Sequence, residues 1–507
     1  MDAEDALLEG DKKLTEENSG EERDGLIHGT QDEKKFFGPD DVLDEIGAKN
    51  GFIIFIFMAM SFVWCIGAPH SVISAFINES DESHCVKNGT DCRPTVSLRS
   101  EFSLYGDKAS LAATSVSVAI AGDIFGGFAL TALSDRYGRK PAVCISLLGL
   151  GIFGCLSALA PNIYVFLVTR CALGAFFSGC TLVNWVLSYE STPHSIRSFT
   201  TMLFGAMWVV GYCGLAPIAY YLHDWRLILA ATAAPGIVVG LIYALILPES
   251  FHFLVGKRKT AKIHHWMKTA ERCGKQKLTI TTEQLMEHMA ITHPVHHEEH
   301  STNKKSTIHD LRELIGSRAL LTKILIMGYL WIANSFVYYA LSLFSTSLAG
   351  NRYVNFVLMG LVELPAYIIS PFLLDRFGRR KVVSIGHAVA GFSMLAAFFL
   401  PSDSVYGALV LWLLAKCSIS SSFNNIFIYA SEVFPTSFRN FSIGLCSTTA
   451  KVVTIFAPHV GALAAIHPKI PILFYGFLGV TAALATLLLP ETLNKPLPST
   501  LSDVQTA

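Results

Sequence analysis

The sequence contains little charge for its length and almost no net charge. Aspartate, glutamate, lysine and arginine make up 16% of the 507 residues, and the formal net charge is −1. A chain this close to neutral offers no electrostatic reason to bind nucleic acid. Residues 1–49 also lack the apolar core of a signal peptide, so we expect the first membrane segment to act as the targeting signal.

Groups that would bind a metal or catalyse a reaction are missing as well. The 11 cysteines are scattered, mostly within apolar runs, and show no zinc-ligand spacing. The histidine-rich stretch 293–300 has no second cluster that would complete a ligand set, so we interpret it as a solvated loop. Because the sequence has no nucleophile–base set and no phosphate-binding loop, we expect neither an enzyme nor a bound cofactor.

Long apolar runs are what the sequence has in abundance. Hydrophobic residues account for 51% of the chain, and the mean hydropathy is +0.44. Twelve runs approach the ~20 residues that span a bilayer, and they lie at about 51–76, 109–132, 141–160, 163–188, 200–222, 226–247, 321–346, 352–374, 382–400, 404–431, 441–465 and 471–489. The sequence therefore predicts an all-α protein with twelve transmembrane helices in a lipid bilayer.

Three short motifs occur twice, in the same order, about 240 residues apart. Residues 134–140 return as 374–381, Glu190, Pro193 and Arg197 return as Glu432, Pro435 and Arg439, and 248–250 return as 490–492. A duplicated membrane unit is the usual architecture of secondary transporters. We therefore expect two pseudo-symmetric halves of six helices each, at 50–248 and 320–490, which open alternately to the two sides of the membrane.

Basic residues set the predicted orientation. Residues 134–140 carry four charged side chains, and each would cost at least ~2.5 kcal/mol at mid-membrane, so we interpret this stretch as a short cytoplasmic loop. The linker 249–319 is also basic and is expected to form short cytoplasmic helices. The tails 1–49 and 491–507 are then cytoplasmic, with an acidic, disordered segment at 1–38 and a short amphipathic helix at 40–49.

The first exofacial loop, 77–108, carries signals of an extracellular or lumenal environment. Asn78 and Asn88 each begin a glycosylation sequon, and Cys85 and Cys92 lie in the same polar loop. Sequons beside two cysteines are typical of a glycosylated, oxidising compartment. A disulfide between Cys85 and Cys92 is one interpretation, and two free thiols are the other.

The duplicated charges are candidates for gating. We expect them to form ion pairs between neighbouring helix ends in the outward-open state, and to separate when the protein opens inward. The alternative is that they only fix topology, but topology alone would not need the repeated acidic residues. The candidate gating residues are Asp135, Arg139, Glu190, Arg197, Asp375, Arg379, Glu432 and Arg439.

Ionisable side chains within membrane helices are functional candidates by default. Lys451 is our candidate for a fixed positive charge that attracts an anionic ligand, because polar residues such as Ser447 and Thr454 share its helix face. A structural ion pair is the alternative for Lys451, and Lys416 is a weaker candidate of the same kind. The candidates for charge coupling are Asp123, Arg170 and Glu363, and Gly174 lies one turn beyond Arg170, where a neighbouring backbone can approach closely.

Aromatic residues cluster near the midpoints of the predicted helices. For any one of them, packing is at least as good an explanation as ligand binding. Together, around a lone cation, they are typical of a cavity for an apolar or aromatic ligand. The candidate binding residues of this kind are Trp208, Tyr212, Tyr338, Tyr339 and Phe423, with Asn424 beside them.

Over residues 40–503 the chain resembles the major facilitator superfamily, and within it the solute-carrier family of organic cation, anion and zwitterion transporters. The matching segments are 42–47, 134–140, 224–226, 363–365, 422–436 with Arg439 and Asn440, and 490–498. In that family the site of Lys451 tends to be acidic in cation carriers and basic in anion and zwitterion carriers. The tyrosines Tyr338 and Tyr339, and the segment 416–424, also resemble the anion branch.

The chain departs from the family pattern at several positions. Asp123 stands at a second-helix position that is normally apolar, Thr131 replaces a usual glycine, and His252 replaces a usual arginine. Because the second and eleventh helices are neighbours in this fold, we hypothesise that Asp123 pairs with Lys451 or carries a proton. The short exofacial loop leaves no basis for assigning an oligomer, and we expect a functional monomer.

These observations predict an alternating-access transporter of small organic ions that prefers anions or zwitterions and lies in the plasma membrane. One alternative is a carrier of organic cations or carnitine-like compounds, with Asp123 or Glu363 as the counter-charge. Another is a membrane protein that has a transporter fold but transports nothing.

Overall fold

In the computed structural model the described residues are 38–78, 96–275, 277–292, 318–348, 350–401, 404–435, 439–460, 463, 467 and 469–495. Eleven of their helical segments are long and apolar enough to cross a membrane, and the apolar helix Ile470–Thr486 (α23) is a shorter twelfth. The predicted all-α membrane fold is therefore confirmed. "Cytoplasmic" below denotes the end of the helices that the basic motifs assign to the cytoplasm.

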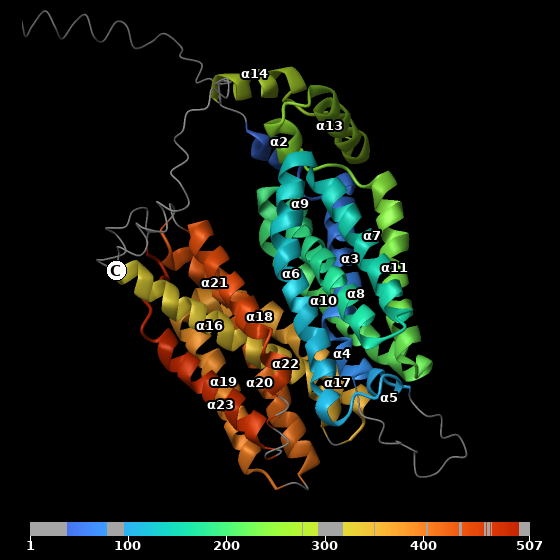
Figure 1. The fold of residues 1–507 in the computed structure, drawn as a ribbon. Coiled ribbons are helices and arrows are strands. Elements are labelled where there is room, and N and C mark those ends of the chain that lie inside the picture. The colour runs from blue at the N-terminus through green and yellow to red at the C-terminus, as the bar shows by residue number, and fades with distance from the viewer. Residues whose placement is uncertain are drawn as a thin grey trace, which may run out of the picture.

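The first half contains six membrane segments. They are built from α3 (Gly51–Val72) with α4 (Ser74–Ile77), α6 (Ser110–Tyr137), α7 (Arg139–Ala158), α8 (Ile163–Ser178) with η2 (Gly179–Val183) and α9 (Asn184–Tyr189), α10 (His194–Leu222) and α11 (Trp225–Ile246). The second half contains α16 (Arg318–Leu343), α17 (Arg352–Leu361) with α18 (Glu363–Phe377), α19 (Arg379–Phe399), α20 (Val405–Val433), α21 (Arg439–Thr454) with α22 (Ala457–Val460), and α23. Figure 1 shows the two bundles side by side.

Helix packing within the first half depends on glycines where two backbones meet. A Cβ on Gly122 of α6 would lie 1.9 Å from the carbonyl oxygen of Cys171 in α8, and one on Gly174 would lie 2.0 Å from that of Ala119. Both distances are far inside van der Waals contact, so only glycine allows these helices to approach so closely. The close approach predicted at Gly174 is confirmed.

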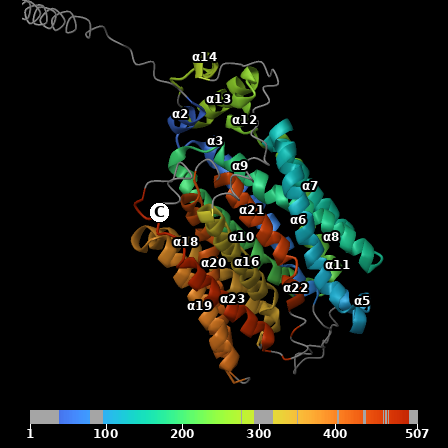
Figure 2. The ribbon, with the colours of Figure 1, turned by 60° about the vertical axis from the view of Figure 1, so that its left-hand side comes forward.

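The two halves contact each other mainly through α10 with α17 and α18, and through α6 with α21 and α22. Tyr212 of α10 stacks on Phe356 of α17, with ring centroids 4.4 Å apart. The hydroxyl of Thr346 donates to the carbonyl of Ala75, which joins the exofacial ends of the two halves. Figure 2 shows α6 beside α21. These contacts lie in the middle and toward the exofacial ends of the helices.

The predicted amphipathic helix near the N-terminus is present as α2 (Pro39–Ile46), whose Val42 and Leu43 are fully buried. It contacts the linker helices α12 (Phe251–Gly256) and α13 (Thr260–Gly274). Figure 2 shows these helices together with α14 (Thr282–Thr292) at one end of the first half. On α13, Trp266 packs edge-to-face on Phe52 of α3 at 5.1 Å. The described part of the linker therefore forms the expected short helices, and they cap the cytoplasmic end of the first half.

One expectation about loops is wrong. Residues 134–140 do not form a loop, because α6 continues to Tyr137 and α7 begins at Arg139, with Gly138 alone between them. The charged side chains are tolerated because both helices extend past the apolar layer. At the start of the next exofacial segment, the Nδ2 of Asn78 donates to the carbonyl of Ala112 at 2.9 Å. Glycosylation of Asn78 stays a prediction. Cys85, Asn88 and Cys92 lie outside the described residues.

A charged contact holds the exofacial helix α5 (Leu98–Glu101) to the start of α11. The carboxylate of Glu101 accepts hydrogen bonds from the guanidinium of Arg226 and from the indole of Trp225. Arg226 also donates to the carbonyls of Ala158 and Ala160 at the end of α7. The hydrogen bond from Arg226 lowers the pKa of Glu101 below its ordinary value, although partial burial acts in the opposite direction.

Acidification should weaken this exofacial contact. Because the pKa of Glu101 is lower in the folded protein, its contribution to stability is present above the ordinary value of 4.5 and is lost as the pH falls through the lowered value. We expect the thermal unfolding midpoint of the wild type to fall more steeply between about pH 6 and about pH 3 than that of Glu101→Gln. Parallel midpoint curves for the two proteins would contradict this assignment.

Candidate functional site

An ion pair between Asp123 and Lys451 joins the two halves. The Nζ of Lys451 on α21 lies 2.7 Å from Oδ2 of Asp123 on α6. The side chains are 33% and 15% exposed, respectively, so both can be reached from solvent. Nearer the exofacial end of α6, the hydroxyl of Ser117 donates to the carbonyl of Ile455. The hypothesised pairing of Asp123 with Lys451 is confirmed, and its role in coupling or binding stays a prediction.

A second ion pair lies entirely within the second half and is fully buried. The Nζ of Lys416 on α20 is 2.8 Å from Oε1 of Glu363 on α18, and neither side chain is exposed. Lys416 also donates to the hydroxyl of Ser342 at 2.6 Å, and Glu363 accepts from the hydroxyls of Tyr338 and Tyr367 at 3.3 and 2.7 Å. Each charge is therefore balanced by its partner and by hydrogen bonds, as burial requires.

Aromatic side chains connect this buried pair to the first half. The indole Nε1 of Trp208 on α10 donates to the hydroxyl of Tyr338 at 3.1 Å, and the ring of Tyr338 stacks on Phe423 at 5.7 Å. The Nζ of Lys416 lies 3.3 Å from the centroid of the Tyr338 ring, which is a favourable cation–π position. The predicted aromatic residues thus converge at the interface between the halves.

The predicted binding residues differ in whether a ligand could touch them. Lys416 and Tyr212 are fully buried and Tyr338 is nearly so, which leaves no direct contact for a ligand in this arrangement. The partly exposed members of the predicted binding set are Trp208, Tyr339, Phe423, Asn424 and Lys451, and the predicted coupling residue Asp123 is partly exposed as well. These six side chains are the ones that remain candidates for direct contact.

Arg170 is not a member of either ion pair. Its side chain on α8 is 1% exposed, and its Nε and Nη1 have no hydrogen-bond partner among the described residues. His70 on α3 is also buried, and it is close enough to Arg170 to interact with its charge. The structure therefore does not bring Arg170 together with Asp123 or Glu363, the other two predicted coupling residues.

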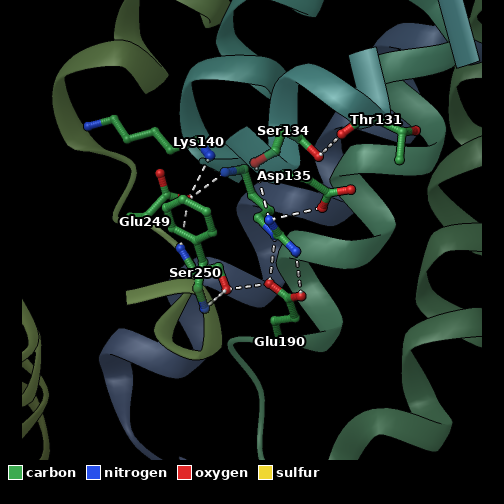
Figure 3. Close-up of polar contacts among 9 residues, drawn as sticks. Thr131, Ser134, Asp135, Lys140, Glu190, Glu249 and Ser250 are labelled. Atoms are coloured by element: carbon green, nitrogen blue, oxygen red, sulfur yellow. Dashed lines mark hydrogen bonds and ion pairs between the residues drawn. The ribbon is translucent and has the colours of Figure 1, made fainter. Parts of the chain in front are cut away.

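Figure 3 shows the first charge motif at the cytoplasmic end of the first half. The guanidinium of Arg139 donates twice to Glu190, at 2.9 and 3.1 Å, and lies 3.2 Å from Asp135. The hydroxyl of Ser250 donates to Glu190 as well. The predicted pairing of Asp135, Arg139 and Glu190 is confirmed.

Glu249 completes this motif in a way that the sequence did not reveal. Its carboxylate accepts from the backbone N–H groups of Arg139 and Lys140 at 2.8 and 2.9 Å, at the start of α7. It thereby satisfies free donors at a helix N-terminus. Gly138 makes this possible, because its φ is +122° and a Cβ there would lie 2.1 Å from the Glu249 carboxylate. The recurrence of residues 248–250 at 490–492 is the sequence pattern that could have indicated this role of Glu249.

The second half repeats the arrangement. The Nε of Arg379 lies 3.0 Å from Glu432, and its Nη1 lies 3.6 Å from Asp375. Glu491 accepts from the backbone N–H of Arg379 at 2.8 Å, and the hydroxyl of Thr492 donates to Glu432 at 2.6 Å. Burial alone would raise the pKa of Glu491, but hydrogen bonds from backbone N–H groups lower it below its ordinary value.

The predicted gating role stays a prediction, and the contacts of its residues differ in detail from those expected. Each motif ion pair joins helices of one half. Arg197 pairs with Asp40 of α2 and not with the motif. Arg439 has no hydrogen-bond partner for its Nε and Nη2 among the described residues.

The interaction of Asp40 with Arg197 is part of the attachment of α2 to the first half. His252 of α12 also contacts Asp40, with Nε2 3.0 Å from Oδ1. Burial alone would raise the pKa of Asp40, but the hydrogen bond from Arg197 and the neighbouring charges lower it below its ordinary value. No group of three or more potential metal ligands occurs among the described residues, and the stretch 293–300 lies outside them.

Comparisons with known proteins show which family this chain is similar to. Residues 51–500 match the model of the family described as "Sugar (and other) transporter". An organic cation transporter protein of Drosophila melanogaster is 36% identical over 80% of this chain and 73% of its own length. Solute carrier family 22 member 15 of Xenopus tropicalis is 34% identical over 85% and 78% of the two chains.

Two further matches extend this result. Organic anion transporter 3 of Oryctolagus cuniculus is 30% identical over 80% of this chain and 73% of its own length. The xylose transporter XylE of Escherichia coli, in an inward-open conformation, superposes with a TM-score of 0.64 over 90% of this chain and 99% of its own, at 19% identity. The last match concerns the fold alone.

Proposed function

This chain belongs to the sugar (and other) transporter family of the major facilitator superfamily, in the branch of organic-ion solute carriers, and we propose that it prefers organic anions or zwitterions. The observation that supports this preference most strongly is Lys451, a partly exposed cation between the two halves. A positive charge there can pair with a carboxylate or sulfate of the substrate. Partly exposed aromatic rings at the same interface, such as those of Tyr339 and Phe423, can hold its organic body.

The internal ion pairs suit an alternating-access mechanism in which each half moves as a rigid body. Arg139 and Arg379 each anchor the ends of several helices of their own half. By contrast, the two halves are joined by a few polar contacts, such as those from Trp208 to Tyr338 and from Asp123 to Lys451. Rocking of one half against the other would break the contacts between halves while leaving each half intact.

A cation carrier is the second candidate, and Asp123 is the residue that favours it. Asp123 is 15% exposed at the same interface as Lys451, whereas Glu363 is fully buried against Lys416. Asp123 is therefore the better counter-charge for a cation. We further propose that the protein acts as a monomer in the plasma membrane and carries glycans on Asn78 and Asn88.

Removal of the Lys451 charge should separate these two candidates. We expect Lys451→Ala to lower the uptake of labelled organic anions and zwitterions by at least about tenfold. The reason is that Lys416, the other basic residue of the predicted binding set, is fully buried and cannot replace it. The measurement is uptake in expressing cells, normalised to surface protein. The matched control is Lys108→Ala, at an exposed exofacial lysine. Unchanged anion uptake together with cation uptake would favour the second candidate.

A further inference from the structure

Of the ion pairs found among the described residues, the one between Asp123 and Lys451 is the pair that joins the two halves. The others lie within one half or attach α2 to it. In Figure 2 the two helices that carry it, α6 and α21, lie side by side. Movement of one half against the other would therefore act directly on this pair.

The pair leaves hydrogen-bonding capacity unused. Oδ1 of Asp123 is buried without a hydrogen-bond partner, although Oδ2 contacts Lys451. Asp123 is the only contact found for the Nζ of Lys451 among the described residues, and an ammonium group can donate three hydrogen bonds. By contrast, Lys416 and Glu363 also bond to hydroxyl groups. The pair between the halves is thus partly exposed and open to exchange of partners, whereas both side chains of the buried pair are shielded from solvent.

The charges on the two residues constrain which ligands can replace the contact. A pure anion that binds Lys451 leaves the Asp123 carboxylate without a counter-charge in a partly buried site. A pure cation that binds Asp123 leaves the ammonium of Lys451 in the same position. Leaving one member of an ion pair unpaired is unfavourable. A ligand that carries both charges can satisfy both residues at once, because its carboxylate replaces Asp123 and its cationic nitrogen replaces Lys451.

We propose that Asp123 and Lys451 together form a binding site for zwitterions, in which the substrate takes the place of the ion pair between the halves. The substrate class is a small organic zwitterion that carries a carboxylate a few bonds away from an ammonium group. Asp123 is then a residue that determines specificity, because it selects against pure anions. This inference rests on the proposed function, since it names the substrate class of the same site.

Three labelled probes with a common phenylalkyl body test the proposal. The zwitterion is N,N,N-trimethylphenylalanine, the cation is phenethyltrimethylammonium and the anion is phenylethanesulfonate. All three keep their charged groups near neutral pH, so none crosses the bilayer in an uncharged form. The measurement is the initial rate of uptake into proteoliposomes that contain the purified, folded full-length chain, with protein-free liposomes as background.

We expect the wild type to take up the zwitterion at least about tenfold faster than either singly charged probe. Asp123→Asn should shift the preference to the anion, and Lys451→Gln should shift it to the cation. The reversed pair, Asp123→Lys with Lys451→Asp, should retain the preference for the zwitterion, which a purely structural salt bridge would not predict. The matched controls, Asp107→Asn and Lys108→Gln, change exposed exofacial charges and should keep the wild-type preference.

Failure of this inference can be told apart from failure of the proposed function. Uptake of the anion or the cation by the wild type at or above the rate of the zwitterion would overturn the zwitterion site and leave organic-ion transport standing. Equal preferences in the wild type and in Asp123→Asn would also overturn it. If folded wild-type protein takes up none of the three probes, the proposed preference and this inference both fail.

Discussion

Lys416→Met should destabilise the protein by about 3–5 kcal/mol, the range for removing one partner of a buried ion pair. Neither side chain of the pair with Glu363 is exposed, and their charged atoms lie 2.8 Å apart. After the substitution the Glu363 carboxylate would keep its hydrogen bonds from Tyr338 and Tyr367 but would have no counter-charge. We would measure the unfolding midpoint of the purified protein in detergent, together with the amount of folded protein expressed.

A double substitution separates the loss of charge balance from the loss of packing. Glu363→Gln combined with Lys416→Met removes both charges, so it should be less destabilising than Lys416→Met alone. Lys469→Met is the control, because its Nζ bonds to the carbonyls of Phe398 and Leu400 and has no acidic partner among the described residues. If Lys416→Met were no more destabilising than this control, the buried pair would not have the importance assigned to it.

Gly122→Ala is expected to be the second most damaging substitution. A Cβ at this position would lie 1.9 Å from the carbonyl oxygen of Cys171, which belongs to the backbone of α8 and cannot move aside alone. The helices would have to separate, and overpacking of this kind costs about 1–3 kcal/mol or more. Alanine is favoured over glycine in a helix by up to about 1 kcal/mol, so the steric cost should exceed the helical gain.

Gly214→Ala provides the matched comparison. Gly214 lies within α10, and a Cβ there would meet no atom within 4 Å. Only the helical preference for alanine then acts, so this variant should be as stable as the wild type or more stable. The two unfolding midpoints, measured side by side in detergent, should lie on opposite sides of the wild-type value. Equal midpoints would mean that α6 and α8 are not packed as closely as the structure describes.

Much of the fold followed from patterns that a sequence displays directly. Apolar runs of bilayer length define the helices, and the repeated charges define the two halves. The pairing of Asp123 with Lys451 could also be predicted, because the fold makes the second and eleventh helices neighbours and the two charges are opposite. Hydropathy does not show where a helix ends beyond the apolar layer, so it predicts a loop at 134–140 where α6 and α7 in fact continue.

Contacts between distant segments were harder to predict. The repeat predicts that Arg197 belongs to the duplicated motif, but its partner Asp40 lies in α2, a segment outside the repeat. Lys416 and Glu363 are each recognisable as charges within helices, yet nothing in their spacing shows that they face each other. A sequon likewise specifies an asparagine but not whether its amide is already hydrogen-bonded, as it is at Asn78.

The most direct test of the central claim is counterflow in proteoliposomes that contain only this protein. Vesicles would be preloaded with unlabelled trimethylphenylalanine and placed in a trace of the labelled compound. A carrier that alternates between two sides predicts a transient accumulation of label above equilibrium, and Lys451→Ala should abolish it. If folded wild-type protein shows no accumulation of the label, the claim that it carries this substrate class is contradicted. If labelled organic anions and cations also fail to accumulate, the result favours a membrane protein that has a transporter fold but does not transport.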